Sequence, residues 1–185
     1  MRTTTTLIIL GFSLCGCVTP QAIQQPTHAI DFAQFKTVSY AVHDNQQTEY
    51  GSSDEDRKYG RDTISLLGSM LGAKLTSLGY QVVDASMPHD LSIDVLVTEA
   101  KPGSGAARFW VGFGAGRADT EFNASFTDAH GVILTSFHGG RSFTGMEMNV
   151  SPFSGRSEIS ALAATRSVQQ IDEFMHAGGV IAAKR

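Results

Sequence analysis

The sequence predicts an α/β fold, a two-layer mixed sheet of about five strands with two amphipathic helices packed against it. Two kinds of pattern lead to this prediction. Several segments alternate between apolar and polar residues, as half-buried strands do, and two longer segments repeat apolar residues every three or four positions, as helices do. A strand, a helix and a second strand also follow one another with short connections, which predicts a parallel pair with a right-handed crossover.

The first half of the chain supplies this strand-helix-strand unit. Residues 35–42, FKTVSYAV, alternate loosely and are rich in β-forming residues, so we expect the first strand there. A helix should follow, with acidic residues 54–56 at its start and Gly79 just after its end. Its apolar face consists of Ile64, Leu67, Leu71, Leu75 and Leu78. The sequence YQVVD, residues 80–84, is predicted to be the second strand.

The second half of the chain predicts three more strands and a second helix. Residues 91–98 and 122–126 each alternate with one apolar face, and the sequence DAHG at 128–131 favours a type I turn. Residues 132–143 should therefore return antiparallel to the strand before the turn. Ser157 is predicted to cap an amphipathic helix that reaches Phe174, with Gly178 after its end. The sequence GGVIAAKR at the C-terminus fits either a frayed tail or a short edge strand.

Four segments are expected along the 185 residues. These are a lipoprotein signal peptide over residues 1–16, a lipidated cysteine and flexible tether over 17–30, a single globular α/β domain over 31–178, and a C-terminal tail over 179–185. An apolar content of 42% is typical of a globular chain. The formal net charge is −4 and no basic stripe is present, so nucleic acid is not an expected partner.

Both cysteines lie at the end of a short apolar run in LIILGFSLCGCVTP, residues 7–20. The run is too short to span a bilayer, which takes roughly 20 apolar residues. With Arg2 before it and small residues at its end, the run is typical of a secretory signal peptide. We therefore expect the protein to be exported.

The sequence Leu14-Cys15-Gly16-Cys17 resembles the lipobox of bacterial lipoproteins. The resemblance implies that a cysteine sulfur takes a diacylglyceryl group, that the peptide is cut before that cysteine, and that the new amino group is acylated. Cys17 is the predicted lipidation site, because Gly16 before it fits a narrow peptidase pocket better than Leu14 before Cys15. Val18 after the anchor, by resemblance to enteric lipoproteins, favours the outer membrane with the domain facing the periplasm. The alternative is a plain signal peptide with incidental cysteines.

The segment RFWVGFGAGR, Arg108–Arg117, is unusually rich in glycine and apolar residues. If it is extended, Gly112, Gly114 and Gly116 leave one face almost without side chains. Two interpretations stay open: a segment packed inside the domain, or a contact with another copy or with the membrane. A dinucleotide fingerprint would need glycine where Arg117 stands, so the spacing argues against nucleotide binding.

The sequences GSGAARFWVGFGAG, residues 103–116, and FTDAHGVIL, residues 126–134, resemble a lipoprotein family known as domain of unknown function 4410. The resemblance covers the chain from about Phe32 to about Phe174. It implies the small α/β domain found in several envelope lipoproteins, among them a curli-secretion pore subunit and an exopolysaccharide-export lipoprotein. Those proteins assemble into rings or dock onto partners. The resemblance implies no activity.

No catalytic, cofactor-binding or metal-binding residue is predicted. The sequence closest to a nucleophile elbow surrounds Ser142, but Thr144 stands where the final glycine is needed. The six histidines lack metal-ligand spacing and are expected to be solvated: His28, His43, His89, His130, His138 and His176. Two pairs of carboxylates are expected to share strand faces as solubilising charge: Asp90 with Asp94, and Asp119 with Glu121.

The sequence therefore predicts an outer-membrane lipoprotein that is not an enzyme and serves as a structural or assembly component of the cell envelope. Its expected partners are the membrane, through acyl chains on Cys17, and a second copy of the chain or another envelope protein. No cofactor is expected. The alternative is an envelope polymer-binding module or hydrolase, which a pocket that gathers Ser142, a histidine and a carboxylate would favour.

Overall fold

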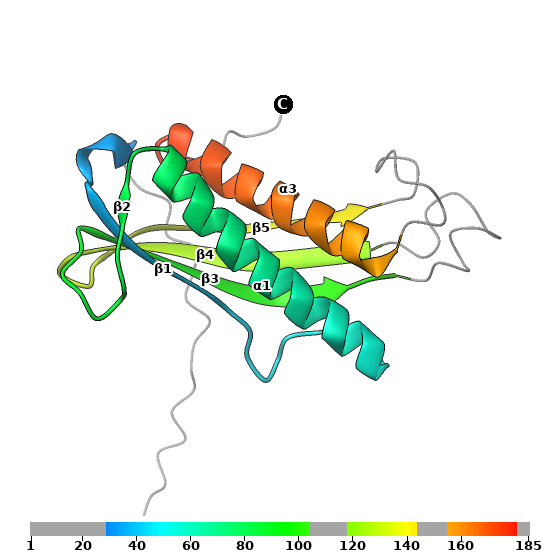
Figure 1. The fold of residues 1–185 in the computed structure, drawn as a ribbon. Coiled ribbons are helices and arrows are strands. Elements are labelled where there is room, and N and C mark those ends of the chain that lie inside the picture. The colour runs from blue at the N-terminus through cyan, green and yellow to red at the C-terminus, as the bar shows by residue number, and fades with distance from the viewer. Residues whose placement is uncertain (1–28, 104–117, 144–154, 181–185) are drawn as a thin grey trace, which may run out of the picture.

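Five strands form one mixed sheet, and two long helices lie side by side on one face of it (Figure 1). The computed structural model describes residues 29–103, 118–143 and 155–180. The strands are β1 (Thr37–His43), β2 (Gln81–Val82), β3 (Leu91–Lys101), β4 (Ala118–Asp128) and β5 (Ile133–Phe143). The helices are the short η1 (Phe32–Gln34) and the long α1 (Asp54–Ser77) and α3 (Arg156–His176). The predicted two-layer α/β fold is confirmed.

The order of the strands in the sheet is β2-β1-β3-β4-β5. β1 pairs in parallel with β2 and with β3, whereas β3, β4 and β5 are joined in antiparallel pairs. The predicted strand-helix-strand unit is β1-α1-β2, although β2 contains two residues rather than the five of YQVVD. The predicted hairpin is β4 and β5, and the turn between them begins at Asp128.

The core lies between the sheet and the two long helices. In β3, the predicted alternation places Leu91, Ile93 and Val95 at 0% exposure towards the helices, with polar residues between them. In α1, the predicted face is correct in its central part, where Leu67, Leu71 and Leu75 are buried. Ile64 and Leu78, at the margins of that face, are half-buried, and Ile64 packs against the core.

The start of α3 differs from the prediction. Gly155, in an extended conformation, is the N-cap residue, and its carbonyl oxygen accepts hydrogen bonds from the amides of Glu158 and Ile159. Ser157 is already inside the first turn, so the prediction that it caps the helix is wrong. A serine near a helix start was a good candidate by composition, but the helix begins one residue before it.

Residue 29 and the end of α3 meet at one end of the domain, which we call the tether pole. There the amide of Ile30 donates to the carbonyl oxygen of Gly178 over 2.8 Å. β1 and β3 start at this pole, and the turn between β4 and β5 lies there too (Figure 1). The first and last described segments of the chain are thus joined at one end of the sheet.

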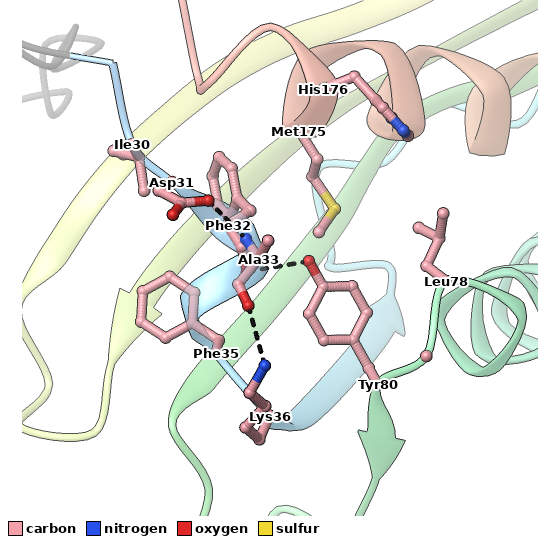
Figure 2. Close-up of a pocket in the computed structure, with 11 residues that line it drawn as sticks. Ile30, Asp31, Phe32, Ala33, Phe35, Lys36, Leu78, Tyr80, Met175 and His176 are labelled. Atoms are coloured by element: carbon pink, nitrogen blue, oxygen red, sulfur yellow. Dashed lines mark hydrogen bonds between the residues drawn. The ribbon is translucent and has the colours of Figure 1, made fainter.

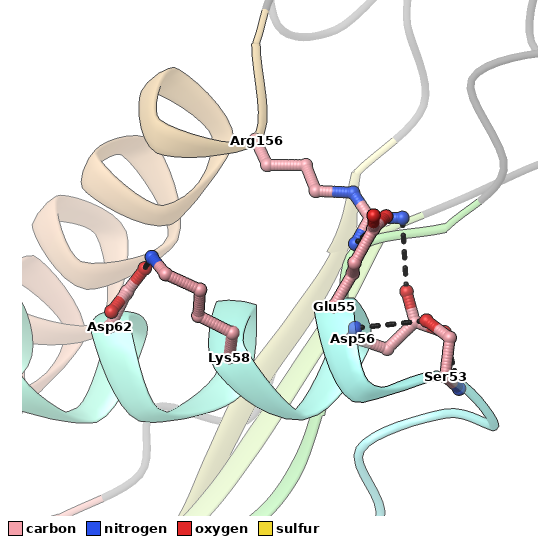
Figure 3. A network of polar contacts seen from close by, with 6 residues as sticks. All are labelled: Ser53, Glu55, Asp56, Lys58, Asp62 and Arg156. Carbon is pink, nitrogen blue, oxygen red and sulfur yellow. Dashed lines mark hydrogen bonds and ion pairs between the residues drawn. The ribbon is translucent and has the colours of Figure 1, made fainter.

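We call the opposite end, where α1 and α3 begin, the far pole (Figure 3). Ser53 and Asp56 form a capping box at the start of α1, in which each side chain accepts from the other residue's backbone amide. Arg156, the first residue of α3, places its guanidinium 3.2 Å from Asp56 and 3.4 Å from Glu55. A cation at a helix start is unfavourable for the helix dipole, and these carboxylates of α1 offset it. The capping hydrogen bonds from Ser53, and Arg156 as well, lower the pKa of Asp56.

Candidate binding pocket

A pocket of about 470 Å³ lies at the tether pole, between η1 and the C-terminal ends of α1 and α3 (Figure 2). Its lining comes from three separate parts of the chain: residues 30–36, residues 78–80 and residues 175–176. Phe32 and Met175 are buried there, and Phe35 and Tyr80 are half-buried. The pocket thus presents polar and apolar surface in about equal measure.

Capped helix ends build the walls of this pocket. At the end of α1, the amides of Gly79 and Tyr80 donate to the carbonyl oxygens of Thr76 and Leu75, which is a Schellman motif. The same pair of bonds closes α3, from Gly178 to Met175 and from Gly179 to Phe174. These motifs end the two helices side by side at the pocket, where Leu78 and Met175 both contribute to the lining.

Asp31 fixes the third wall, because its carboxylate accepts from the amide of Ala33 over 3.1 Å and caps η1. The hydroxyl of Tyr80 donates to the carbonyl oxygen of Phe32 over 3.1 Å, and the ammonium of Lys36 donates to that of Ala33 over 3.3 Å. Burial, and then the nearby Asp31 carboxylate, raise the pKa of Tyr80, so its phenol stays protonated at neutral pH. η1 is therefore held by side chains from both sides.

His176 lies at the rim beside an ion pair that joins the two long helices. The ammonium of Lys74 in α1 is 2.8 Å from the Asp172 carboxylate in α3. Nδ1 of His176 lies 2.8 Å from the main-chain oxygen of Asp172 and 3.1 Å from its carboxylate. The pocket contains one ammonium, that of Lys36, one imidazole, that of His176, and one carboxylate, that of Asp31.

This lining is suited to binding. Its rings and aliphatic side chains offer apolar surface, and its polar groups are held in place by main-chain atoms. The residues that line it include no serine, threonine or cysteine, and the hydroxyl of Tyr80 donates to the main-chain oxygen of Phe32. The pocket can hold an apolar group and place an anionic neighbour near Lys36.

The residues of the nearest nucleophile-elbow sequence lie in a strand. Ser142 is in β5 and pairs with Asp119 of β4. His138, on the same strand, pairs with Asn123 and lies four residues away, which is roughly 13 Å along a strand. The described residues therefore do not gather Ser142, a histidine and a carboxylate into one pocket.

The predicted carboxylate pairs have separate structural roles. Asp90 accepts from the amides of Lys36 and Thr37, 2.9 Å each, and these bonds lower its pKa. Asp94 faces His43 over 3.0 Å. Partial burial lowers the pKa of His43, but the hydrogen bond to Asp94 and smaller contributions outweigh it, and the net shift is upward. Glu121 lies 3.7 Å from His138, whose Nδ1 is 3.0 Å from the side-chain oxygen of Asn123.

Two predictions concern residues outside the described ranges. Cys17, the predicted lipidation site, and the glycine-rich segment Arg108–Arg117 both lie there, as does His28. Neither α1 nor α3, nor any other described helix, combines the length and apolar character needed to cross a bilayer. In residues 29–103, 118–143 and 155–180, no three acidic, histidine or cysteine side chains gather closely enough to hold a metal ion.

The sequence did not predict the pocket. Phe32 and Tyr80 are 48 residues apart in the chain, and Met175 comes from the end of the last helix. The sequence features that bear on the pocket were Gly79 and Gly178, the glycines that end α1 and α3. They located the helix ends, but they do not show that the two ends lie together.

Comparisons with known proteins give one family and several distant structures. The model of a family described as "Domain of unknown function (DUF4410)" matches residues 30–146. No curated protein matches the chain.

Similar solved structures include a PelC dodecamer from Paraburkholderia phytofirmans in space group P6, with 15% identity and a TM-score of 0.42. The similarity covers 77% of this chain and 88% of that one. A DUF4136 family protein from Bacteroides thetaiotaomicron has 14% identity and a TM-score of 0.35, with 82% of this chain and 94% of that one covered.

Proposed function

This chain belongs to the family described as domain of unknown function DUF4410, and we propose that it is a lipid-anchored envelope protein that acts by binding a partner protein. The family carries no activity with it, so the proposal depends on the pocket and on the predicted anchor. In this proposal Cys17 carries the acyl chains, the outer membrane holds them, and the domain faces the periplasm. The protein has no catalytic role in this proposal.

The observation that carries the proposal is the lining of the pocket at the tether pole. Phe35 and Tyr80 are half-buried around it, and Lys36 stands at its rim. An apolar side chain of a partner that fills such a pocket contributes about 1.5–3 kcal/mol. An acidic residue beside that side chain would lie near Lys36. The chemistry of the pocket therefore suits an apolar and acidic segment of another envelope protein.

The predicted anchor would allow a contact as weak as one side chain in this pocket to bind a partner. Eleven residues separate Cys17 from Ala29, and a flexible tether of this length reaches on the order of 20 Å. A binding site held this close to a membrane meets membrane-bound partners at a high effective concentration, so a weak contact is sufficient. The anchor and the pocket thus support the same role.

The pocket is tested by photocrosslinking in intact cells. A photoreactive phenylalanine analogue replaces Phe35 in the pocket, and a matched variant carries it at Asn123, which is exposed on the sheet face away from the helices. We expect Phe35 to give a defined adduct with an envelope protein or with a second copy, and Asn123 not to give it. The absence of any protein adduct at Phe35, or the same adduct at both positions, would refute binding at the pocket.

The anchor is tested separately. Cys17→Ser should leave an unprocessed precursor that takes up no labelled fatty acid, and Cys15→Ser should be processed and labelled as usual. Unchanged labelling of the Cys17 variant would show that the anchor is assigned wrongly.

A further inference from the structure

The tether pole carries large apolar side chains that the fold leaves in solvent. Within the described residues, four large hydrophobic side chains are exposed, namely Met87 at 56%, Val132 at 57%, Val180 at 39% and Ile133 at 36%. Single exposed apolar residues are common on protein surfaces and need no explanation. Here, however, all four belong to the same end of the molecule.

The positions of these side chains follow from the topology. Met87 lies in the connection from β2 to β3, and Val132 and Ile133 lie where the β4–β5 turn enters β5. The start of β3 pairs with the end of β4, which joins β5 through that turn, so both connections are at the tether pole (Figure 1). Val180 follows Gly179, whose oxygen accepts from Thr135 near the start of β5.

The turns that present these side chains are well fixed by their own aspartates. Asp84 accepts from the amide of Ser86 over 2.9 Å, and Asp128 accepts from the amides of His130 and Val132 over 2.8 and 2.9 Å. The carboxylates are therefore turned towards the backbone of their turns. Met87 and Val132 stand beside these capped turns as exposed apolar groups.

The chain also reaches its predicted anchor from this pole. Ile30 is bonded to Gly178, and the tether from residue 17 must arrive at Ala29 next to it. A tether of about 20 Å confines this pole, more than the far pole, to the neighbourhood of the lipid. The sheet extends from this pole to the far pole, so the far pole lies at the greater distance from the anchoring point (Figure 1).

We infer that the turns of the tether pole lie against the lipid bilayer, with Met87, Val132, Ile133 and Val180 in the interfacial layer, and that the pocket between η1 and the helix ends stays open to a protein partner. This inference rests on the proposed anchoring through Cys17. A few partly inserted side chains do not hold a free protein on a membrane, but they orient one that acyl chains already keep there. The contact thus sets which end of the domain faces the lipid.

The charges at this pole specify the kind of lipid surface. Among the described residues, the carboxylates of Asp31, Asp84, Asp90 and Asp128 outnumber the ammonium of Lys36, so this part of the surface is acidic on balance at neutral pH. Acidic groups do not attract anionic headgroups. The contact is therefore apolar, and it should be as strong on zwitterionic lipid as on anionic lipid and insensitive to salt.

Site-specific fluorescence in proteoliposomes tests the orientation. The mature lipoprotein offers no free thiol if Cys15 leaves with the signal and Cys17 is acylated, so an environment-sensitive probe labels one introduced cysteine. Met87→Cys and Val132→Cys report on the proposed surface. Lys58→Cys is the matched control, because its side chain is exposed near the start of α1 at the far pole. The vesicles contain phosphatidylcholine with or without brominated acyl chains.

We expect the probes at 87 and 132 to shift to shorter emission wavelength on reconstitution and to be quenched by brominated lipid. The probe at 58 should show neither change. Equal quenching at both poles, or none at 87 and 132, would overturn the inference. Probes at 87 and 132 that are shielded already in detergent and not quenched by lipid would show that protein covers this surface, which also overturns it.

Two further measurements separate this inference from the anchor on which it rests. Mass spectrometry of the mature N-terminus shows whether Cys17 is acylated, and flotation shows whether the chain is held on the vesicles. An acylated, floating protein without quenching at 87 and 132 refutes the orientation alone. A chain without acyl groups refutes the anchor itself.

Discussion

The two poles of the domain are held together by different interactions. At the tether pole, phenylalanine rings from four elements pack on one another, with centroids of Phe126 5.3 Å from Phe32 and 5.4 Å from Phe174. Phe137 stacks on Phe174 at 4.2 Å. At the far pole, a smaller apolar cluster of Tyr59, Ala118, Ile159 and Ala163 joins the helix starts, together with the ion pairs of Arg156, whose side chain is 45% exposed.

The comparison shows where the stability of this domain resides. Burial of an aromatic side chain removes a large apolar surface from water, whereas an exposed ion pair gains little over the hydration that it loses. Contacts at the tether pole also join residues that are far apart in the sequence, such as Ile30 and Gly178. We expect substitutions of the buried rings at the tether pole to cost more free energy of unfolding than substitution of the exposed Arg156 at the far pole.

The largest effect is expected for Phe126→Ala. This ring is 0% exposed and contacts rings from η1, β5 and α3, so its removal leaves a cavity and should lower the free energy of unfolding by about 3–5 kcal/mol. Equilibrium urea unfolding followed by circular dichroism measures the change. Phe126→Leu keeps most of the apolar volume and should lose less. A loss for the alanine variant as small as that of an Arg156 variant would contradict the comparison.

An intermediate effect is expected for Gly178→Ala. The residue has φ +67°, and an added Cβ would lie 2.9 Å from the Cβ of Ala29 and 3.2 Å from the oxygen of Ile30. The left-handed conformation alone costs a residue with a Cβ about 1–2 kcal/mol. Gly79→Ala is the matched control, because Gly79 has φ +90° with nothing within 4 Å of such a Cβ.

The same unfolding measurement compares these two glycines. We expect the Gly178 variant to lose more stability than the Gly79 variant, since residues 29–30 must move. Equal losses at both positions would show that the first described residues are not packed against the end of α3.

Substitution of Asp90 at the tether pole should change how the free energy of unfolding depends on pH. Backbone hydrogen bonds from Thr37 and Lys36 lower the pKa of Asp90 in the folded state below its unfolded value of about 3.9. The stabilisation is therefore complete above about pH 4 and is lost as the pH falls further through the folded-state pKa. Asp90→Asn should show a weaker decline of unfolding free energy below about pH 4 than the parent protein does. An unchanged acid slope would exclude Asp90 as a contributor.

The smallest effect is expected for Arg156→Ala at the far pole. Exposed ion pairs contribute about 0–1 kcal/mol, and salt screens them. We expect a loss of about 0.5 kcal/mol in low salt that shrinks as salt is added. Arg166→Ala on the same helix is the control, because Arg166 is exposed and donates to Gln169 of its own helix. A loss of several kcal/mol would mean that the far pole is not held as described.

Sequence periodicity was sufficient for the elements that have one buried face. The repeat of Leu67, Leu71 and Leu75 located α1, and the alternation from Leu91 to Val97 located β3, because burial on one face imposes these periods. The sequence DAHG located the β4–β5 turn, where Asp128 accepts from the amides of the turn. These features depend on residues close together in the chain.

The features that the sequence could not predict depend on residues that are far apart. β2 is cut to two residues because it pairs with the start of β1 alone, and the candidate pocket needs the ends of α1 and α3 to meet η1. The N-cap of α3 was missed because Gly155 caps through its main chain, with no side chain to signal it. Lipidation of Cys17 stays a prediction, since it lies outside the described residues.

The outer strand of the sheet has one more consequence, for contacts between copies of the chain. The side-chain amide of Gln170 in α3 accepts from the nitrogen of Gly140 over 2.9 Å and donates to its oxygen over 3.3 Å, as a neighbouring strand would. A bare strand edge invites identical molecules to add strand by strand into fibres. Gln170 occupies that edge at Gly140, so a second copy of the chain cannot extend the sheet along β5 without displacing it.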